Sequence, residues 1–168
     1  MIDKLPINWE WIPLGEYVEN HDAARVPVSS KEREKRQGKY PYYGASGVID
    51  QIDGYTHQGE YLLLGEDGAN LLARSKPIAF LANGKFWVNN HAHVLKCRGE
   101  APNAYLAYYL NRIDLAPYVT GTAQPKLSQA KMNKIPIPVA PLDQQKRIVA
   151  EIEKQFSRLD EAVANLKR

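Results

Sequence analysis

The sequence contains a single cysteine, Cys97, among its 168 residues. One thiol cannot form a disulfide within the chain, and its presence suits a reducing compartment such as the cytoplasm. No run approaches the roughly 18 apolar residues that a membrane span requires. The amino-terminal residues 1–11 also lack the apolar core of a secretory signal. We therefore expect a cytoplasmic protein that does not enter a membrane.

Two motifs of nucleotide-using and methyl-transferring enzymes are missing. No glycine-rich loop ends in Gly-Lys-Ser or Gly-Lys-Thr, the sequence that binds ATP phosphates. There is also no Asn/Asp-Pro-Pro-aromatic tetrapeptide, in which amino-methyltransferases hold the target amine; Asn89 and Asn90 are followed by His91. The sequence therefore predicts no catalytic residue, no cofactor and no metal in this chain.

The charge of the chain permits a nucleic-acid partner without requiring one. Its formal net charge is +3 and its calculated isoelectric point is near 8.9. Basic residues gather in the segment 29–39, directly before a group of tyrosines, and this combination suits contact with a DNA backbone. The candidate DNA contacts in this part of the chain are Lys31, Arg33, Lys35, Arg36, Lys39, Tyr42 and Tyr43.

Residues 40–99 consist of short β-prone runs separated by glycines. Segments 61–66, 77–82, 85–89 and 93–98 have the length and the aromatic or branched content of strands. Residues 101–119 show apolar residues at helical spacing, with Pro117 limiting the far end. The fold class that these patterns predict is α+β, with a β-rich, irregular globular body over residues 1–141.

A long helix is predicted for residues 142–168. Prolines at 136, 138 and 141 exclude helix from 135–141 and favour extended backbone there. From residue 149 onward, apolar residues recur at alternating steps of three and four, the period of a seam against another helix. The predicted seam is Val149, Ile152, Phe156, Leu159, Val163 and Leu166, with Gln145 as a polar residue in the same stripe. The alternative is a terminal helix packed on its own domain.

Two polar groups in the β-rich region have competing interpretations. Glu66 and Asp67 resemble a metal-binding nuclease pair, but adjacent carboxylates between glycines are more often turn formers. His91 and His93 are expected to share one face of a strand and could begin a zinc site, which needs four ligands. Alternatively, Asn89, Asn90, His91 and His93 form a polar patch that contacts DNA bases or phosphates, or a hydrogen-bonded turn that leads into a strand.

Several motifs together resemble one protein family. These are GTAQPKLS at 121–128, IPIPVAP at 135–141 and LDQQKRIV at 142–149, preceded by LPINWEWIPLGEYVE at 5–19 and YYGASGVID at 42–50. This order resembles the specificity subunit of type I restriction–modification systems, where a target recognition domain meets a conserved spacer helix. The carboxy-terminal RLDEAVANLKR is more similar to the first spacer than to the second, which implies the amino-terminal half of such a subunit.

The resemblance implies a protein that reads one half of a bipartite double-stranded DNA site and performs no chemistry itself. It further implies that the helix holds methyltransferase subunits and, through them, the restriction subunit. S-adenosylmethionine, ATP and Mg²⁺ would bind to those partner subunits. In the 121–128 loop, Gln124 and Lys126 are candidate DNA contacts; alternatively, this loop braces the root of the helix. A possible homodimer through the helix is a further expectation.

Two other interpretations remain open from the sequence. The chain could be a recognition domain detached from a fused restriction–methyltransferase polypeptide. It could also be a protein-interaction module that dimerises through its helix.

Overall fold

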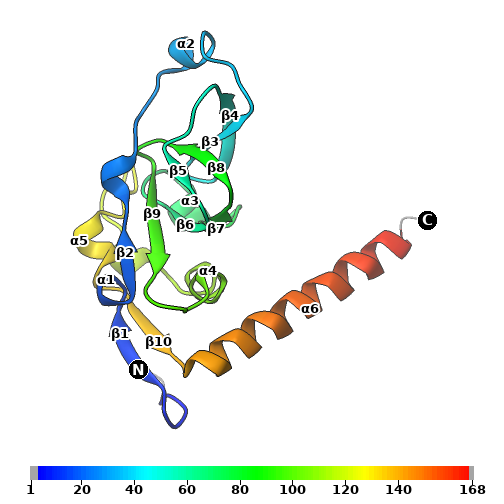
Figure 1. Cartoon of the computed structure of the whole chain (residues 1–168). Coiled ribbons are helices and arrows are strands. Elements are labelled where there is room, and N and C mark those ends of the chain that lie inside the picture. Colours follow the sequence, from blue (N-terminus) through cyan, green and yellow to red (C-terminus); the bar gives the residue numbers. More distant parts are fainter. Residues whose placement is uncertain (1–3, 167–168) are drawn as a thin grey trace.

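The computed structural model describes residues 4–166 and consists of a β-rich body from which one long helix projects (Figure 1). The body contains two four-stranded sheets and one two-stranded sheet. Within the described residues, the helices lack the length and apolar content of a membrane span.

The first sheet forms the centre of the body. Its strands lie in the order β2 (Val18–Asn20), β9 (Ala92–Cys97), β6 (Tyr61–Gly65) and β7 (Ala79–Ala82), all antiparallel. The continuous apolar run of β6 follows from its position, because both faces of this strand are covered. Leu62 and Leu64 belong to the main core, which includes helix α4, whereas Leu63 packs against the second sheet.

The second sheet covers the opposite face of the first. Its order is β4 (Gly47–Ile52), β3 (Tyr40–Gly44), β8 (Lys85–Val88) and β5 (His57–Gln58). β3 and β8 are parallel, and the other pairs are antiparallel. Phe86 and Val88 of β8 pack on Val94 of β9, so the core between the two sheets is aromatic and aliphatic.

The helices of the body are short, except for α4 (Asn103–Arg112). The others are α1 (Leu14–Tyr17), η1 (Asp22–Ala24), α2 (Ser30–Arg33), α3 (Asn70–Ala73), η2 (Ala116–Tyr118) and α5 (Gln129–Met132). The expectation of one helix over 101–119 is wrong, because Ile113 adopts extended backbone and a separate 3-10 turn follows. The guanidinium of Arg74 binds the carbonyl oxygens of Leu110 and Ile113, which replaces the helical bonds that a longer helix would make.

The proline-rich segment is extended, as predicted. β10 (Pro136–Val139) pairs antiparallel with β1 (Glu10–Pro13) to form the two-stranded sheet. A two-stranded ribbon has two edges and no interior, so it tolerates prolines that lack an N–H donor. This ribbon leads directly into the long helix.

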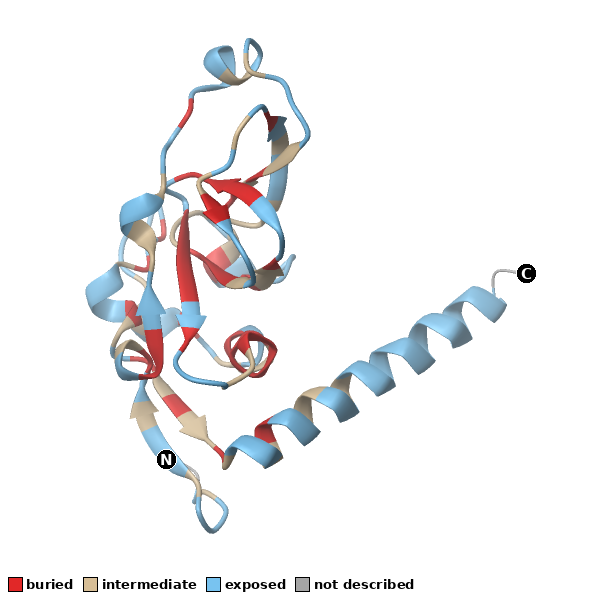
Figure 2. Ribbon diagram, in the orientation of Figure 1, coloured by how far each residue is buried: buried red, intermediate tan, exposed pale blue. Residues whose placement is uncertain are grey.

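Helix α6 spans Leu142–Leu166, so it begins where the sequence predicted, and residues 167 and 168 of the predicted helix lie outside the described part. Its root is tied to the body: Gln145 is buried, and the Trp9 indole donates to Gln144. Beyond residue 152 every described residue is exposed (Figure 2). The outer part of the helix is therefore largely free of the body, although the Phe156 ring has its centroid 6.0 Å from that of Tyr108 of α4.

Candidate nucleic-acid interface

The arginines of the predicted basic segment hold the second sheet together. Arg33 forms an ion pair of 2.8 Å with Asp50 of β4 and lies 4.7 Å from the centre of the Tyr42 ring. Its hydrogen bond lowers the pKa of the Asp50 carboxyl. Arg36 pairs with Asp53 at 2.8 Å and stacks over Trp87 at 4.9 Å. Both guanidinium groups are therefore occupied by the protein itself.

The lysines of the same segment differ from the arginines, and within the described residues their one aromatic contact is that of Lys39, 5.5 Å from the centre of the Tyr40 ring. Lys31, Lys35 and Lys39 are exposed, and none lies within ion-pair distance of a carboxylate in residues 4–166. Ser29 caps α2 by accepting the amide of Glu32, which fixes the helical turn that carries Lys31. The lysines of this segment are thus the groups available to phosphates.

The two tyrosines lie in the protein core or close to it. Tyr42 is 1% exposed, and its hydroxyl accepts the Val28 amide at 2.9 Å. Tyr43 is half-buried, and its ring stacks on Phe80 with centroids 5.9 Å apart. The prediction that Tyr42 contacts DNA does not fit this burial, because both faces of its sheet are covered.

Four segments form a continuous surface, which we call the loop surface: residues 45–49, 66–70, 89–91 and 120–126. The Asn89 amide donates to the Tyr43 carbonyl, and the Glu66 amide donates to the His91 carbonyl. The Gly68 amide donates to the Pro125 carbonyl at 3.0 Å. Gly65 allows the 45–49 segment to lie close to the start of the 66–70 segment, because a Cβ at residue 65 would lie 2.9 Å from the Ala45 carbonyl oxygen.

The predicted residues on the loop surface differ in accessibility. Asn89 is buried, and its side chain accepts the amide of His91, so its role is that of the hydrogen-bonded turn. Asn90 and Gln124 are exposed. His91 is also exposed and lies 2.8 Å from the Asp67 carboxylate. Of the Asn89, Asn90 and His91 group, two side chains therefore face solvent.

The 120–126 loop is anchored to the 66–68 segment. Thr120 and Lys126 exchange both backbone hydrogen bonds, which closes a small hairpin. The Leu127 amide donates to the Glu66 carbonyl at 2.7 Å, and Leu127 is fully buried. These bonds place the loop beside the 66–68 segment, and the alternative that the loop braces the helix root stays a prediction.

Sequence patterns did not identify four further residues of the loop surface. Val48 and Ile49 are 53% and 55% exposed beside the turn between β3 and β4. The Asn70 amide nitrogen donates to the Ser46 hydroxyl at 3.3 Å across two of the segments. The two consecutive apolar residues after Gly47 could have indicated an exposed contact surface, but the buried end of a strand has the same sequence pattern.

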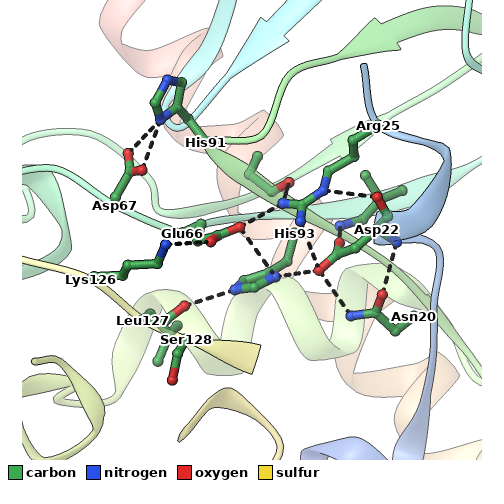
Figure 3. Close-up of polar contacts among 12 residues, drawn as sticks. Asn20, Asp22, Arg25, Glu66, Asp67, His91, His93, Lys126, Leu127 and Ser128 are labelled. Atoms are coloured by element: carbon green, nitrogen blue, oxygen red, sulfur yellow. Dashed lines mark hydrogen bonds and ion pairs between the residues drawn. The ribbon is translucent and has the colours of Figure 1, made fainter. Parts of the chain in front are cut away.

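Below the loop surface lies a cluster of charged residues, which we call the charged cluster: Asp22, Arg25, Glu66, His93 and Lys126 (Figure 3). Glu66 lies 2.6 Å from Arg25 and 3.1 Å from Lys126. Burial, the largest single cause, acts to raise the pKa of Asp22 and of Glu66. The hydrogen bonds and nearby positive charges outweigh it together, with His93 leading for Asp22 and Arg25 for Glu66, so both pKa values are lowered.

The charged cluster resembles a metal site in composition only. Ligand atoms of Asp22, Glu66 and His93 lie within 4.8 Å of one another. Arg25 and Lys126 already neutralise the carboxylates, and a cation there would have to displace them. Glu66 belongs to this cluster through its ion pair with Arg25, whereas its neighbour Asp67 pairs with His91. The donor set therefore fits an ion-pair network better than a metal or a nuclease centre.

His91 and His93 do not share one face of a strand, contrary to expectation. β9 begins at Ala92, so His91 belongs to the preceding turn and faces Asp67 at the surface. His93 is 1% exposed and points toward the main core. This separation removes the geometric basis of the zinc hypothesis.

Comparisons with known proteins agree with the sequence motifs. The family model for the type I restriction modification DNA specificity domain matches residues 6–167. S.HindORF215P of Haemophilus influenzae, assigned as a type I restriction enzyme specificity subunit, is 42% identical over 140 residues, which is 83% of this chain and 35% of that protein. The Escherichia coli type I restriction enzyme EcoprrI specificity subunit is 27% identical over 82% of this chain and 33% of its own length.

A solved structure shares the fold. The S subunit of a type I restriction–modification system from M. genitalium has a TM-score of 0.71 at 17% identity, over 96% of this chain and 43% of that one. The chain thus spans about a third of the curated relatives it matches. Since the family model covers nearly the whole chain, this protein belongs to the family of type I restriction–modification DNA specificity domains.

Proposed function

We propose that this chain binds one half of a bipartite double-stranded DNA site as part of a type I specificity subunit. The observation that carries the proposal is the loop surface, where segments as distant in the sequence as 45–49 and 120–126 present exposed polar and apolar side chains together. Loops on a rigid scaffold are the usual place for recognition. Membership of the family supports the same function.

The exposed residues divide naturally between two kinds of contact. Lys31, Lys35 and Lys39 would bind phosphates, which fix the position of a protein on DNA without reading its sequence. Asn90, His91 and Gln124 offer hydrogen bonds to base edges, and Asn or Gln can pair with adenine through two bonds. Val48 and Ile49 offer apolar contact to a thymine methyl group.

The exposed stripe of α6 is proposed to hold the partner subunits. Phe156, Leu159 and Val163 are 54%, 57% and 40% exposed, which is unfavourable for three large apolar side chains on one helix face. In a full specificity subunit this stripe would face a second spacer helix, and the pair would dock the methyltransferase subunits. S-adenosylmethionine, ATP and Mg²⁺ would act on those partners, and this chain would be a non-catalytic component in the cytoplasm.

Selection from a randomised duplex library tests the DNA-binding function. We expect the protein to enrich one short sequence, and the enrichment to fall in Asn90→Ala and Gln124→Ala. Gln155→Ala on the outer part of α6 is the matched control and should enrich the same sequence as the wild type. Recovery of unselected DNA by the wild-type protein would contradict sequence-specific binding by this chain.

A further inference from the structure

His93 connects the first sheet to the 120–126 loop. It lies on β9 and is 1% exposed. Its Nδ1 lies 2.6 Å from the Asp22 carboxylate, and its Nε2 lies 2.8 Å from the Leu127 carbonyl oxygen (Figure 3). A carbonyl oxygen only accepts hydrogen bonds, so Nε2 must carry a proton.

The Nδ1 side of the ring faces Asp22, which is held by several other groups. Its carboxylate also accepts from the Asn20 amide nitrogen and from the Val94 amide, and Arg25 lies 3.4 Å away. These contacts fix the position of the carboxylate, and the carboxylate in turn orients the His93 ring.

His93 lies among charged groups from several segments. Asp22 follows β2, Glu66 follows β6 with its carboxylate 3.8 Å from Nδ1, and Lys126 comes from the loop itself. Arg25 bridges the two carboxylates at 3.4 Å and 2.6 Å. Arg25, Lys126 and His93 thus share two carboxylates, and this arrangement holds four separate segments of the chain together.

The contact with Leu127 distinguishes His93 from the rest of the charged cluster. Leu127 is the residue at which the 120–126 loop returns to the core. Its carbonyl oxygen accepts from His93, while its amide is held by the Glu66 carbonyl. Across residues 4–166, His93 is the one side chain outside the 120–128 segment that bonds the backbone of this loop. This bond from a buried residue of the sheet therefore adds to the backbone bonds of the 66–68 segment in holding the loop that carries Gln124.

We propose that His93 is a positioning residue for DNA recognition: its Nε2–H fixes the 120–126 loop against the 89–91 turn, two residues from His91. This role rests on the proposed function, because the loop has to contact DNA for its position to matter there. His93 itself is buried and touches no DNA. The bond to Leu127 supplies the positioning, and the bond to Asp22 orients the ring.

Two conservative variants separate these bonds. In His93→Gln the side-chain amide reaches the place of Nε2 and can still donate to the Leu127 carbonyl. In His93→Asn the amide lies near the place of Nδ1 and can donate only toward Asp22. We expect His93→Gln to keep DNA affinity close to wild type and His93→Asn to lose about tenfold, the effect of one hydrogen bond.

Amide hydrogen exchange without DNA provides a second measurement. The amides of Lys126 and Leu127 should exchange faster in His93→Asn than in His93→Gln, with circular dichroism confirming that both variants are folded. Equal protection of these amides in the two variants overturns the proposal, as does wild-type DNA affinity in folded His93→Asn. If His93→Asn does not fold, His93→Gln decides alone: native protection of the loop supports the proposal, and its loss overturns it.

The two hypotheses fail in different ways. If the wild-type protein enriches no DNA sequence, the proposed function is wrong, whereas the exchange comparison still decides whether His93 positions the loop. If the wild type binds DNA and the two variants bind equally well, the proposed function stands and the role of His93 is wrong. Lys134→Met, which removes one positive charge from an exposed side chain outside the charged cluster and leaves both bonds of His93 in place, is the control and should keep the loop amides protected.

Discussion

At the scale of single residues, Gln145 explains how the long helix joins the body. It occupies a position of the apolar stripe, yet it is 3% exposed. Its Oε1 accepts from the Tyr17 hydroxyl at 2.7 Å, and its Nε2 donates to the Ala140 carbonyl at 2.8 Å. Burial raises the pKa of Tyr17, so this hydroxyl remains a neutral donor. The polar residue in the stripe therefore faces its own domain and not a partner helix.

We expect Gln145→Leu to lower the free energy of unfolding by about 1–3 kcal/mol, since the Tyr17 hydroxyl loses its partner in a buried place. Urea denaturation measures the loss. The double variant Tyr17→Phe, Gln145→Leu should lose less than the sum of the single variants, because neither residue then leaves the other unpaired. Strictly additive losses would show that the two side chains do not interact.

Acid should destabilise the protein in two stages. Burial is the main cause that lowers the pKa of His57 below 6.5, so the unfolded chain takes up a proton that the folded chain resists. The contribution of His57 to the free energy of unfolding is thus fully present above pH 6.5 and is lost as the pH falls below that value. Asp22 and Glu66 have lowered pKa values, so their contribution is present above their ordinary values of 3.8 and 4.5 and is lost below them.

His57→Phe provides the matching variant, because the His57 ring stacks on Phe86 with centroids 5.5 Å apart and a phenyl ring can take its place. Thermal unfolding between pH 7 and pH 5 should show a smaller decrease of Tm in this variant, while the decrease below pH 4.5 persists. An unchanged decrease between pH 7 and pH 5 would mean that His57 does not cause the first stage.

At this scale, the sequence indicated which segments are charged or aromatic, but not which of their side chains point into the protein. Lys31, Lys35 and Lys39 are exposed, as a charged segment predicts, whereas Arg33 and Arg36 turn inward to Asp50 and Asp53. Each carboxylate lies 17 residues after its arginine, Asp50 on β4 and Asp53 directly after that strand, and no local pattern matched them to this segment. Tyr42 is buried because both faces of its sheet are covered, which no local pattern reveals.

At the scale of elements, the outer part of α6 should associate with a second copy. Phe156, Leu159 and Val163 lie in one stripe and are at least 40% exposed. Each buried side chain of this kind contributes roughly 1.5–3 kcal/mol, enough to favour association of two chains. Sedimentation should show a concentration-dependent homodimer, and Phe156→Asp with Leu159→Asp should give a folded monomer.

Ser157→Asp with Ala164→Asp is the control for this experiment. It adds the same charge to exposed positions of the helix outside the stripe, so dimerisation should persist. A wild-type protein that stays monomeric at high micromolar concentration would contradict association through the stripe.

The long helix was predictable because its signals are local. Its period, the prolines before it and Asp143 in its first turn are all contained in the segment itself. The end of α4 was not predictable from its own residues. Arg74, which binds the last carbonyl oxygens of that helix, lies 36 residues before Leu110. A contact between distant segments thus overrode a regular pattern of apolar residues.

At the scale of the whole molecule, the modest net charge of +3 predicts weak non-specific DNA binding with few phosphate contacts. If Lys31, Lys35 and Lys39 each neutralise one phosphate, changing all three to Ala should reduce the slope of log affinity against log salt by about 2 to 3. Filter binding or fluorescence anisotropy at several salt concentrations measures this slope.

Changing Lys146, Lys154 and Arg158 of α6 to Ala removes the same charge from the helix and is the control. A slope that falls equally in both triple variants would indicate a response to net charge alone. An unchanged slope in the first variant would place the 31–39 segment away from DNA.

The assembly of the loop surface was beyond sequence reasoning, although several of its pieces were found. The motifs at 66–70, 89–91 and 121–128 were each recognised as polar loops. Their contact depends on the strand order β2-β9-β6-β7 and on the parallel pairing of β3 with β8, which local periodicity does not specify. Val48 and Ile49 were missed for the same reason.

The buried root of α6 also limits how far the helix can tilt relative to the body. A helix of 25 residues is a lever of about 37 Å, at about 1.5 Å per residue. A rotation of about 5° at its root displaces the far end by roughly 3 Å, close to the spacing of about 3.4 Å between successive base pairs. The bonds of Gln144 and Gln145 to Trp9 and Tyr17 therefore limit the angular error with which the helix projects. A looser root would let the far end of the helix move by a distance comparable to the spacing of one base pair.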